Sequence, residues 1–379
     1  MKRKISWLIC ISLTITNMAI GSKTEQTKTE KPVIQVVFLL DATGSMSGLI
    51  GTAKEKIWSI AGSLSQTEPA PDIEIGMIFY RDRGDDFITK QIPLGKDMDN
   101  LYEQLMLIQA EGGGDSPESV NQALYESITK INWNNSNNAY RAIFLVGDCP
   151  PHMDYRDDVK YPESCSLAKS KDIVINTILM GNDNQAKKIW KEIASLTNGE
   201  FIQTDMSVNN IDVRTPFDEK INELQFDLDN TRIYYGSSLD LSEQKMSQSK
   251  VAFEQAATNA RRAEFNMSNK ASYYGSQELL YDIINGKKLT EIKSSQLPKN
   301  IQNYTEKQLK DYVDSLILVR KNLESEITTL SKQRQDFIDG KLHEIDAEKV
   351  ESSFDNVIFR SVQKQAETKG IKIEGKAKR

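Results

Sequence analysis

Apolar residues follow two alternating patterns along the first half of the chain. Short runs of β-branched and aliphatic residues are typical of buried strands, and stretches in which apolar residues recur every three to four positions are typical of amphipathic helices. The first pattern predicts strands at 33–40, 73–80, 87–93, 142–146, 173–179 and 200–203. The second predicts helices at 48–66, 98–109, 118–131 and 185–196.

This alternation predicts an α/β fold with a doubly wound, mostly parallel, Rossmann-like sheet, because right-handed crossovers connect parallel strands. The connection between the strands at 73–80 and 87–93 is too short for a crossover helix. We therefore expect an antiparallel hairpin there, which gives the sheet one antiparallel edge strand.

The strand pattern ends near residue 216, and the following residues are predicted to be helical. In the longest helical stretch, apolar residues follow a coiled-coil-like 4-3 spacing that Arg320 and Arg334 interrupt, so we expect a helical hairpin rather than one long coiled coil. The tail is Lys/Glu-rich from Lys364 and is expected to be frayed. Helices are expected at 217–228, 241–266, 276–286 and 305–345. The predicted domains are a sheet domain at 33–215, a helical region at 216–350 and a polar tail at 351–379.

The N-terminal residues predict export. Three basic residues at 2–4 precede an apolar stretch, and the small residues Ala19 and Gly21 suit cleavage after Gly21, so we interpret residues 1–21 as a signal peptide. An uncleaved membrane anchor is the alternative, which the short and polar-interrupted stretch disfavours. Residues 22–32 are polar and are expected to form a flexible leader. The protein is thus expected in the periplasm, associated with the envelope, or secreted.

Charge and hydropathy exclude some classes of partner for the mature chain. Loss of residues 1–21 removes three basic residues and changes the formal net charge from −6 to −9. An acidic chain without a basic stripe is a poor nucleic-acid binder, and no other segment is apolar enough to span a membrane. Export permits a disulfide between Cys149 and Cys165, and two unpaired thiols are the equal alternative.

Three loops with oxygen-bearing side chains are expected at one edge of the sheet. Asp41, Thr43 and Ser45 directly follow the first strand, and their alternate spacing directs three oxygen ligands to one point. The other loops are 112–118 (GGGDSPE) and 146–152 (VGDCPPH). Ligands of open α/β sheets bind beyond the carboxyl ends of the strands, and oxygen ligands suit a hard cation such as Mg²⁺.

In these features the chain resembles a von Willebrand factor type A domain with a metal-ion-dependent adhesion site, over roughly residues 33–215. The family motif is Asp-x-Ser/Thr-x-Ser on one loop, Thr on a second and Asp on a third. The first loop matches, and Asp148 matches the third element. Where the family has Thr, this chain has Asp115 and Ser116, of which we favour Ser116 as the ligand. The chain is most similar to bacterial exported members with a helical C-terminal region.

The resemblance implies a non-catalytic adhesion or binding module. The cation would be Mg²⁺, or Ca²⁺ or Mn²⁺, and the partner would be a protein or cell-surface ligand that presents an Asp or Glu carboxylate. With Asp115 as a direct ligand, the cation would attract that carboxylate less. Ser47, Arg81 and Asp82 are expected to contact the partner, and waters around the cation are the alternative contact for Arg81 and Asp82, because the turn that carries them should lie on the metal face.

Two other functions stay open. The protein could be a structural or assembly factor of the cell envelope, in which the metal only stabilises the fold. A metal-dependent hydrolase is less favoured, because the two histidines, His152 and His343, lie in different regions and no nucleophile motif is present in the expected context.

Overall fold

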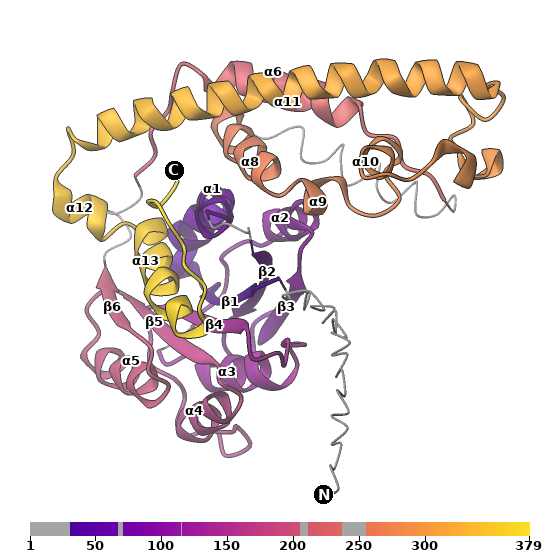
Figure 1. Cartoon of the computed structure of the whole chain (residues 1–379). Helices are drawn as coiled ribbons and strands as arrows, with labels where there is room; N and C mark the ends of the chain where they lie inside the picture. Colours follow the sequence, from indigo (N-terminus) through magenta and orange to yellow (C-terminus); the bar gives the residue numbers. More distant parts are fainter. Residues whose placement is uncertain (1–30, 67–70, 115, 205–210, 237–254) are drawn as a thin grey trace, which may run out of the picture. The chain divides into compact units, whose positions relative to one another are not determined.

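A computed structural model describes residues 31–66, 71–114, 116–204, 211–236 and 255–379. It contains a six-stranded sheet with the strand order β3-β2-β1-β4-β5-β6 (Figure 1). β3 is antiparallel to β2, and the other neighbouring strands are parallel. The predicted doubly wound sheet with one antiparallel edge strand is therefore confirmed. The strands are β1 (Val33–Asp41), β2 (Asp72–Tyr80), β3 (Thr89–Gly95), β4 (Ala139–Gly147), β5 (Val174–Met180) and β6 (Phe201–Thr204).

The central strand β1 ends level with both of its neighbours. Asp41 is paired with Tyr80 of β2, and Leu40 is paired with Val146 of β4. The loops that leave these three strands consequently begin at the same edge of the sheet.

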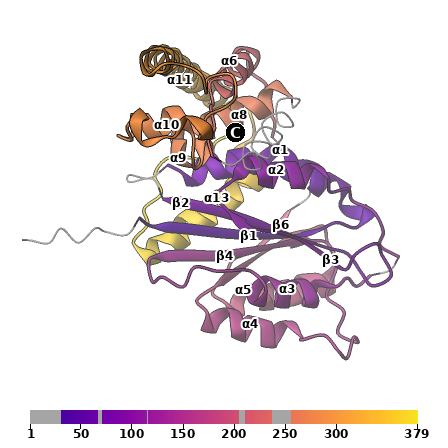
Figure 2. The same cartoon turned by 90° about the vertical axis from the view of Figure 1, so that its right-hand side faces the viewer.

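Helices cover both faces of the sheet (Figure 2). Alternate residues of β1 point into opposite cores, with Phe38 in one and Leu39 in the other. The Leu39 core includes the helix α4 (Tyr161–Ser170), which no pattern predicted because most of its buried positions hold the small residues Ser164, Cys165 and Ala168. On the Phe38 face lie α1 (Ser47–Leu64), which follows the 3₁₀ turn η1 (Gly44–Met46), and α2 (Met98–Met106). On the Leu39 face lie α3 (Val120–Thr129), α4 (Tyr161–Ser170) and α5 (Asn184–Leu196).

The C-terminal residues belong to the sheet domain, so the predicted frayed polar tail is wrong. Helix α13 (Phe354–Ala366) packs its apolar face into the Phe38 core, and the residues after the turn η4 (Glu367–Lys369) bury Ile371 and Ile373 there. In the sequence of α13, polar and charged residues alternate with the apolar residues, so the segment reads as polar. Its apolar residues share one face only once the helix is formed. The helical region is therefore an insertion between β6 and α13.

The helical region begins with α6 (Asp218–Asn230), as predicted. The expected helix at 241–266 lies partly outside the described residues, and its described end belongs to α8 (Ala256–Ser268). The other elements are α9 (Lys270–Tyr274), α10 (Leu279–Ile284), the 3₁₀ turns η2 (Leu289–Glu291) and η3 (Ser294–Gln296), α11 (Glu306–Leu342) and α12 (Ala347–Glu351).

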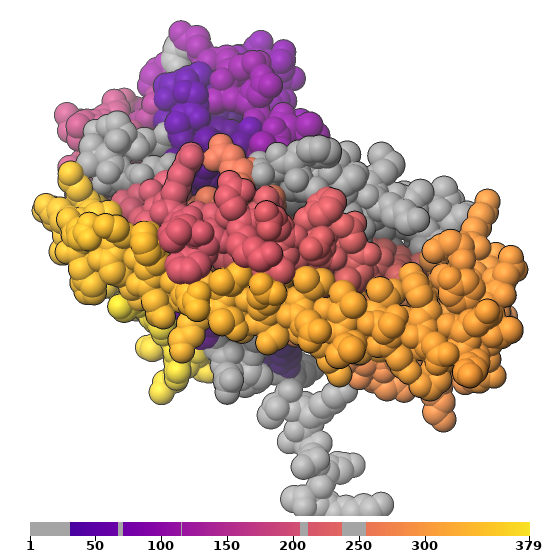
Figure 3. Space-filling view, turned by 90° about the horizontal axis from the view of Figure 1, so that it is seen from above, coloured from indigo at the N-terminus to yellow at the C-terminus, as the bar shows by residue number. Residues whose placement is uncertain are grey.

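Helix α11 is one continuous helix of 37 residues, which confirms the helix expected at 305–345, but its two arginines do not divide it into a hairpin as we expected. The two arginines that interrupt its apolar seam are buried and paired. Arg320 Nη1 lies 2.8 Å from Glu278 Oε2, and Arg334 Nε lies 2.8 Å from Asp218 Oδ1. Because acidic partners on other elements neutralise them, these arginines do not break the helix. Figure 3 shows α11 running alongside α6.

No helix among the described residues is long and apolar enough to cross a membrane.

Candidate metal-binding edge of the sheet

The first loop brings its three predicted ligands together. Asp41 is the last residue of β1 and is fully buried. Its Oδ1 accepts hydrogen bonds from Thr43 N at 2.9 Å and Thr43 Oγ1 at 2.6 Å. Thr43 Oγ1 lies 3.2 Å from Ser45 Oγ, and Ser45 is exposed. The loop therefore places the buried Thr43 hydroxyl between a buried carboxylate and the exposed Ser45 hydroxyl.

The second loop is joined to the first by its backbone. Gly44 N donates to Gly112 O at 3.1 Å, and Glu111 N donates to Ala42 O at 3.0 Å. Gly113 has a φ of +81°, and a Cβ atom there would lie 3.1 Å from Thr43 Cβ. A glycine is needed at this position for both its conformation and its close approach to the first loop.

The third loop places Asp148 beside Asp41. A Cβ atom at Gly147, the last residue of β4, would lie 3.1 Å from Asp41 Oδ2, so the two loops are in close contact where Asp148 begins. Asp148 is half-buried. Its neighbour Cys149 has a pKa raised to about 12, chiefly by burial, while a hydrogen bond from Ser116 opposes the shift. Ser116 therefore lies at the same edge, and Asp115 lies outside the described residues.

The two cysteines of the described chain are both free thiols. Cys165 is buried in α4, and Cys149 is half-buried in the third loop. The disulfide that export would permit is thus not formed, and the alternative of two unpaired thiols is confirmed.

Glu118 is a member of this site that the sequence reasoning did not select. It is 2% exposed, and its Oε1 would lie 3.6 Å from a Cβ atom at Gly113. Its backbone N–H donates to Pro150 O at 3.0 Å, and its carbonyl accepts from His152 N at 3.1 Å. The only signal in the sequence was a glutamate at the end of a Gly-rich loop before a helix. That signal is ambiguous, because acidic residues are also favoured at helix N-termini for their interaction with the helix dipole.

The buried carboxylates of the site have no positive partner. Asp41 Oδ2, Glu118 Oε2 and Asp148 Oδ1 are buried without a hydrogen-bond partner. Among the described residues, no Lys or Arg forms an ion pair with any of the three. Burial, with a contribution from Asp148, raises the pKa of Asp41 to about 7. Burial and the neighbouring carboxylates raise the pKa of Glu118 to about 9.

These residues fit a hard divalent cation. Hydroxyl and carboxylate oxygens are its preferred ligands, and the unpaired carboxylates supply negative charge. Within the described ranges, no three His, Cys, Asp or Glu side chains form a compact cage. The fit is therefore to an ion held by hydroxyl groups, with waters between it and the carboxylates.

Arg81 and Asp82 hold the loops in place, and the structure does not present them to a partner as we expected. They are 4% and 5% exposed. Arg81 Nε donates to Ala42 O at 3.1 Å, and Asp82 accepts from Ser119 Oγ at 2.8 Å and from Tyr155 OH at 2.9 Å. Their burial follows from these bonds to the first loop and to residues that follow the second and third loops. Ser47, at the start of α1, is exposed as a partner contact requires.

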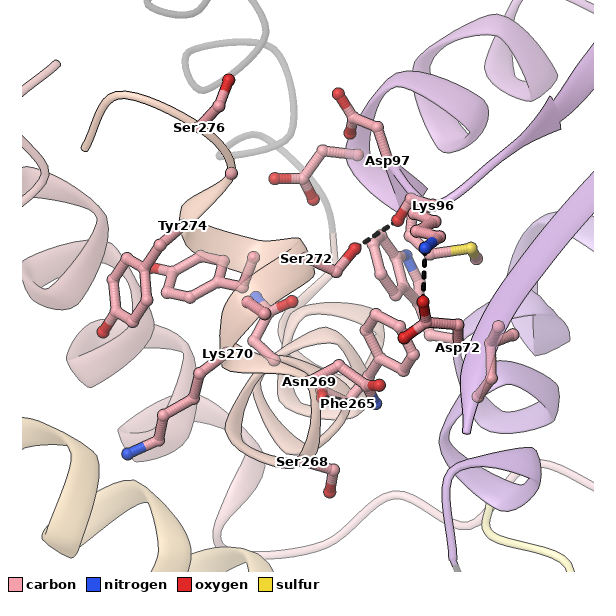
Figure 4. Close-up of a pocket in the computed structure, with 18 of the residues that line it drawn as sticks. Asp72, Lys96, Asp97, Phe265, Ser268, Asn269, Lys270, Ser272, Tyr274 and Ser276 are labelled. Carbon is pink, nitrogen blue, oxygen red and sulfur yellow. Dashed lines mark hydrogen bonds and ion pairs between the residues drawn. The ribbon is translucent and has the colours of Figure 1, made fainter. Parts of the chain in front are cut away.

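A separate pocket of about 600 Å³ lies at the opposite end of the strands, where β2 begins (Figure 4). Three of its charged groups are paired with one another, because Lys31 and Lys96 both form ion pairs with Asp72. Ser272, in α9, donates to the backbone carbonyl of Lys96. The Ser272 bond connects the helical region to the sheet domain, and the ion pairs satisfy charged groups at the start of β2.

Comparison with known proteins identifies the sheet domain. Residues 35–206 match the family model of the von Willebrand factor A domain. The chain thus contains such a domain, which confirms the resemblance over the strands, and the match ends just after β6.

Relatives share only part of their length with this chain. A protein of Acanthamoeba polyphaga mimivirus, named as an ariadne-like RING finger protein, is 23% identical over 199 residues, which cover 48% of this chain and 19% of that protein. The chain thus spans about a fifth of that relative.

Solved structures of proximal thread matrix protein 1 from the mussel byssus are similar over 47% of this chain and 43% of theirs. One has 13% sequence identity and a TM-score of 0.36. Another, with zinc in its MIDAS motif, has 15% identity and a TM-score of 0.38. At these values the likeness carries no functional conclusion.

Proposed function

We propose that this protein is a non-catalytic module that binds a protein partner or cell-surface ligand through a divalent cation. Thr43 and Ser45 would coordinate the cation, together with Ser116 or Asp115 from the second loop. Asp41 and Asp148 would accept hydrogen bonds from the waters that the cation retains. Mg²⁺ is the ion that we expect, and Ca²⁺ or Mn²⁺ suits the same oxygen ligands.

The observation that carries this proposal is a set of buried carboxylate oxygens without partners below exposed hydroxyl groups. Asp41 and Asp148 each have one such oxygen. Burying an ionised carboxylate without a compensating charge is costly. A divalent cation supplies that charge, and the exposed Ser45 and Ser116 leave its outer side open to a partner.

The partner would complete the coordination of the cation with an oxygen ligand, for which an Asp or Glu carboxylate is our expectation. Exchange of a water for this group gains electrostatic attraction in a partly dry site. The von Willebrand factor A domain at residues 35–206 supports this class of function, because such domains commonly bind protein ligands. We further propose that the protein acts outside the cytoplasm, as residues 1–21 predict.

The surroundings of the histidines support a non-catalytic role. His152 stacks on Tyr155, with ring centroids 4.0 Å apart, and its Nδ1 lies 2.8 Å from Asp154 Oδ1. His343 lies at the end of α11 in the helical region. In the described part of the chain, neither imidazole is hydrogen-bonded to a Ser or Cys side chain, the pairing that a hydrolytic nucleophile uses. An assay against a panel of hydrolase substrates with added Mg²⁺ or Mn²⁺ tests this, and turnover that Asp41→Ala abolishes would contradict it.

The proposal is tested by a pull-down from cell-envelope extract, with wild type beside Asp41→Ala, in MgCl₂ and in EDTA. We expect a partner that wild type recovers in MgCl₂, loses in EDTA and recovers again when Mg²⁺ is restored. Asp41→Ala should recover none of it, while its circular dichroism stays that of wild type. Equal recovery in EDTA would contradict the proposal. A lower melting temperature in EDTA with unchanged recovery would favour a structural role for the metal.

A further inference from the structure

Glu118 is a buried carboxylate whose backbone is fixed by the third loop. Its N–H and C=O are bonded to Pro150 and His152, at 3.0 and 3.1 Å. The side chain is 2% exposed, and its Oε2 has no hydrogen-bond partner. The third loop therefore holds the backbone of Glu118 on both sides, and the carboxylate is buried at the contact between the second and third loops.

The Glu118 side chain faces the first loop across Gly113. A Cβ atom on that glycine would contact both Thr43 Cβ, at 3.1 Å, and Glu118 Oε1, at 3.6 Å. The space of about one methyl group thus separates Glu118 from a hydroxyl-bearing residue of the site. Glu118 is also close enough to Asp41 and Asp148 to be repelled by both carboxylates.

Other acidic residues near Glu118 have hydrogen-bond partners for their carboxylates. Asp82 accepts hydrogen bonds from Ser119 and Tyr155, and Asp85 accepts from Gly113 N at 3.2 Å. Each is satisfied by a loop group that it holds in place. Glu118 shares its unsatisfied state with Asp41 and Asp148, which are the carboxylates assigned to the cation.

We propose that Glu118 is a third carboxylate of the cation site, beside Asp41 and Asp148, and that it accepts hydrogen bonds from the waters of the cation. This inference rests on the proposed function, because it requires a cation. Three carboxylates carry one more charge than a divalent cation neutralises. The loaded site therefore holds its cation more tightly than a site with two carboxylates would, and it attracts a partner's carboxylate less strongly.

Calorimetric titration of the purified protein with MgCl₂, CaCl₂ and MnCl₂ tests this role. The variants are Glu118→Gln, which removes the charge and keeps the shape, and Glu111→Gln, a matched control at the exposed position directly before the same loop. We expect Glu118→Gln to bind the preferred cation about 10–100-fold more weakly, the effect typical of groups that support metal ligands. Glu111→Gln should bind as wild type does.

The outcomes separate this inference from the proposed function. A wild type that binds none of the three cations at millimolar concentration overturns both. A wild type that binds, beside a folded Glu118→Gln of equal affinity, overturns only the role of Glu118. If Glu118→Gln does not fold, crystals of wild type grown with MnCl₂ decide. A Glu118 carboxylate oxygen within about 5 Å of the ion, the span of one bridging water, supports the role, and a carboxylate beyond that distance contradicts it.

Discussion

The helical region and the loop edge of the sheet both bury charged side chains, but they compensate these charges differently. In the helical region, Arg320 is fully buried and donates two hydrogen bonds to Glu278, at 2.8 and 3.0 Å. Arg262 pairs with Asp99 at 2.6 Å and with Asp229 at 2.8 Å. At the loop edge, Asp41 and Glu118 are equally buried, and in the described chain they have no basic partner.

This difference distinguishes charges that join parts of the protein from charges that require a ligand. Each buried arginine connects two elements that are distant in sequence, and its removal should affect folding alone. The carboxylates at the loop edge connect nothing through their unpaired oxygens. Removal of such a carboxylate should therefore not lower the stability of the cation-free protein, but it should reduce the stabilisation that a bound cation gives.

The largest expected effect tests the paired charges. Arg320→Met should lower the free energy of unfolding by about 3–5 kcal/mol, because Glu278 would stay buried without its partner. Urea unfolding at neutral pH measures this change. Lys321→Met, at the exposed neighbouring position, is the control and should change stability by less than about 0.5 kcal/mol. If both variants resemble wild type, the buried ion pair does not hold α11 in place.

A smaller effect tests the unpaired carboxylates. A cation present at about 100 times its dissociation constant should stabilise wild type by about 2.7 kcal/mol, because it binds only the folded state. Asp41→Asn should lose this gain and should be at least as stable as wild type in EDTA, since it buries one charge fewer. Thermal unfolding in MgCl₂ and in EDTA measures both quantities. Loss of stability of Asp41→Asn in EDTA would show that the carboxylate serves the fold.

The pH dependence gives a third contrast. Folding raises the pKa of Asp41 from 3.8 to about 7 and that of Glu118 from 4.5 to about 9. At a pH between the unfolded and the folded pKa of either group, the folded protein binds more protons than the unfolded chain. Its stability in EDTA should therefore fall as the pH rises from 5 to 9. A bound cation should weaken this dependence. Melting temperatures across that pH range measure it, and a flat profile in EDTA would contradict the raised pKa values.

The smallest expected effect concerns Ser47, which is exposed beside the site. Ser47→Ala should leave cation affinity unchanged and stability within about 0.5 kcal/mol of wild type. It should lower the cation-dependent recovery of the partner several-fold if Ser47 contacts the partner as we predict. The same pull-down measures this effect, and unchanged recovery would place the contact elsewhere.

The strands and the first loop could be predicted because their signals are local. A buried run such as 33–40 and an Asp-Thr-Ser spacing directly after it need no knowledge of distant residues. The helix at 305–345 was predicted from the same kind of local signal. The hairpin expected there was wrong because the partners of Arg320 and Arg334 are Glu278 and Asp218, on other elements. The tail was mispredicted because its many charged residues indicate a frayed segment. Only the helical arrangement of α13 shows that its apolar residues lie together on one face.

Within the site, sequence reasoning found the motif residues and missed the group that depends on tertiary packing. The burial of Glu118 results from bonds of its backbone to Pro150 and His152, which no spacing in the second loop reveals. For the same reason, Arg81 and Asp82 were placed on the partner surface. Their positions in a turn indicated exposure, and contacts with the first loop and with residues after the other two loops bury them instead.

The most direct test is a crystal of the protein grown with MnCl₂ and measured for anomalous scattering. The account predicts one strong peak among the hydroxyl groups of Thr43 and Ser45, on the side that faces Asp148. The same experiment on Asp41→Ala should show no peak there. A wild-type map without a peak at this edge under millimolar Mn²⁺ would contradict the central claim that these loops hold a cation.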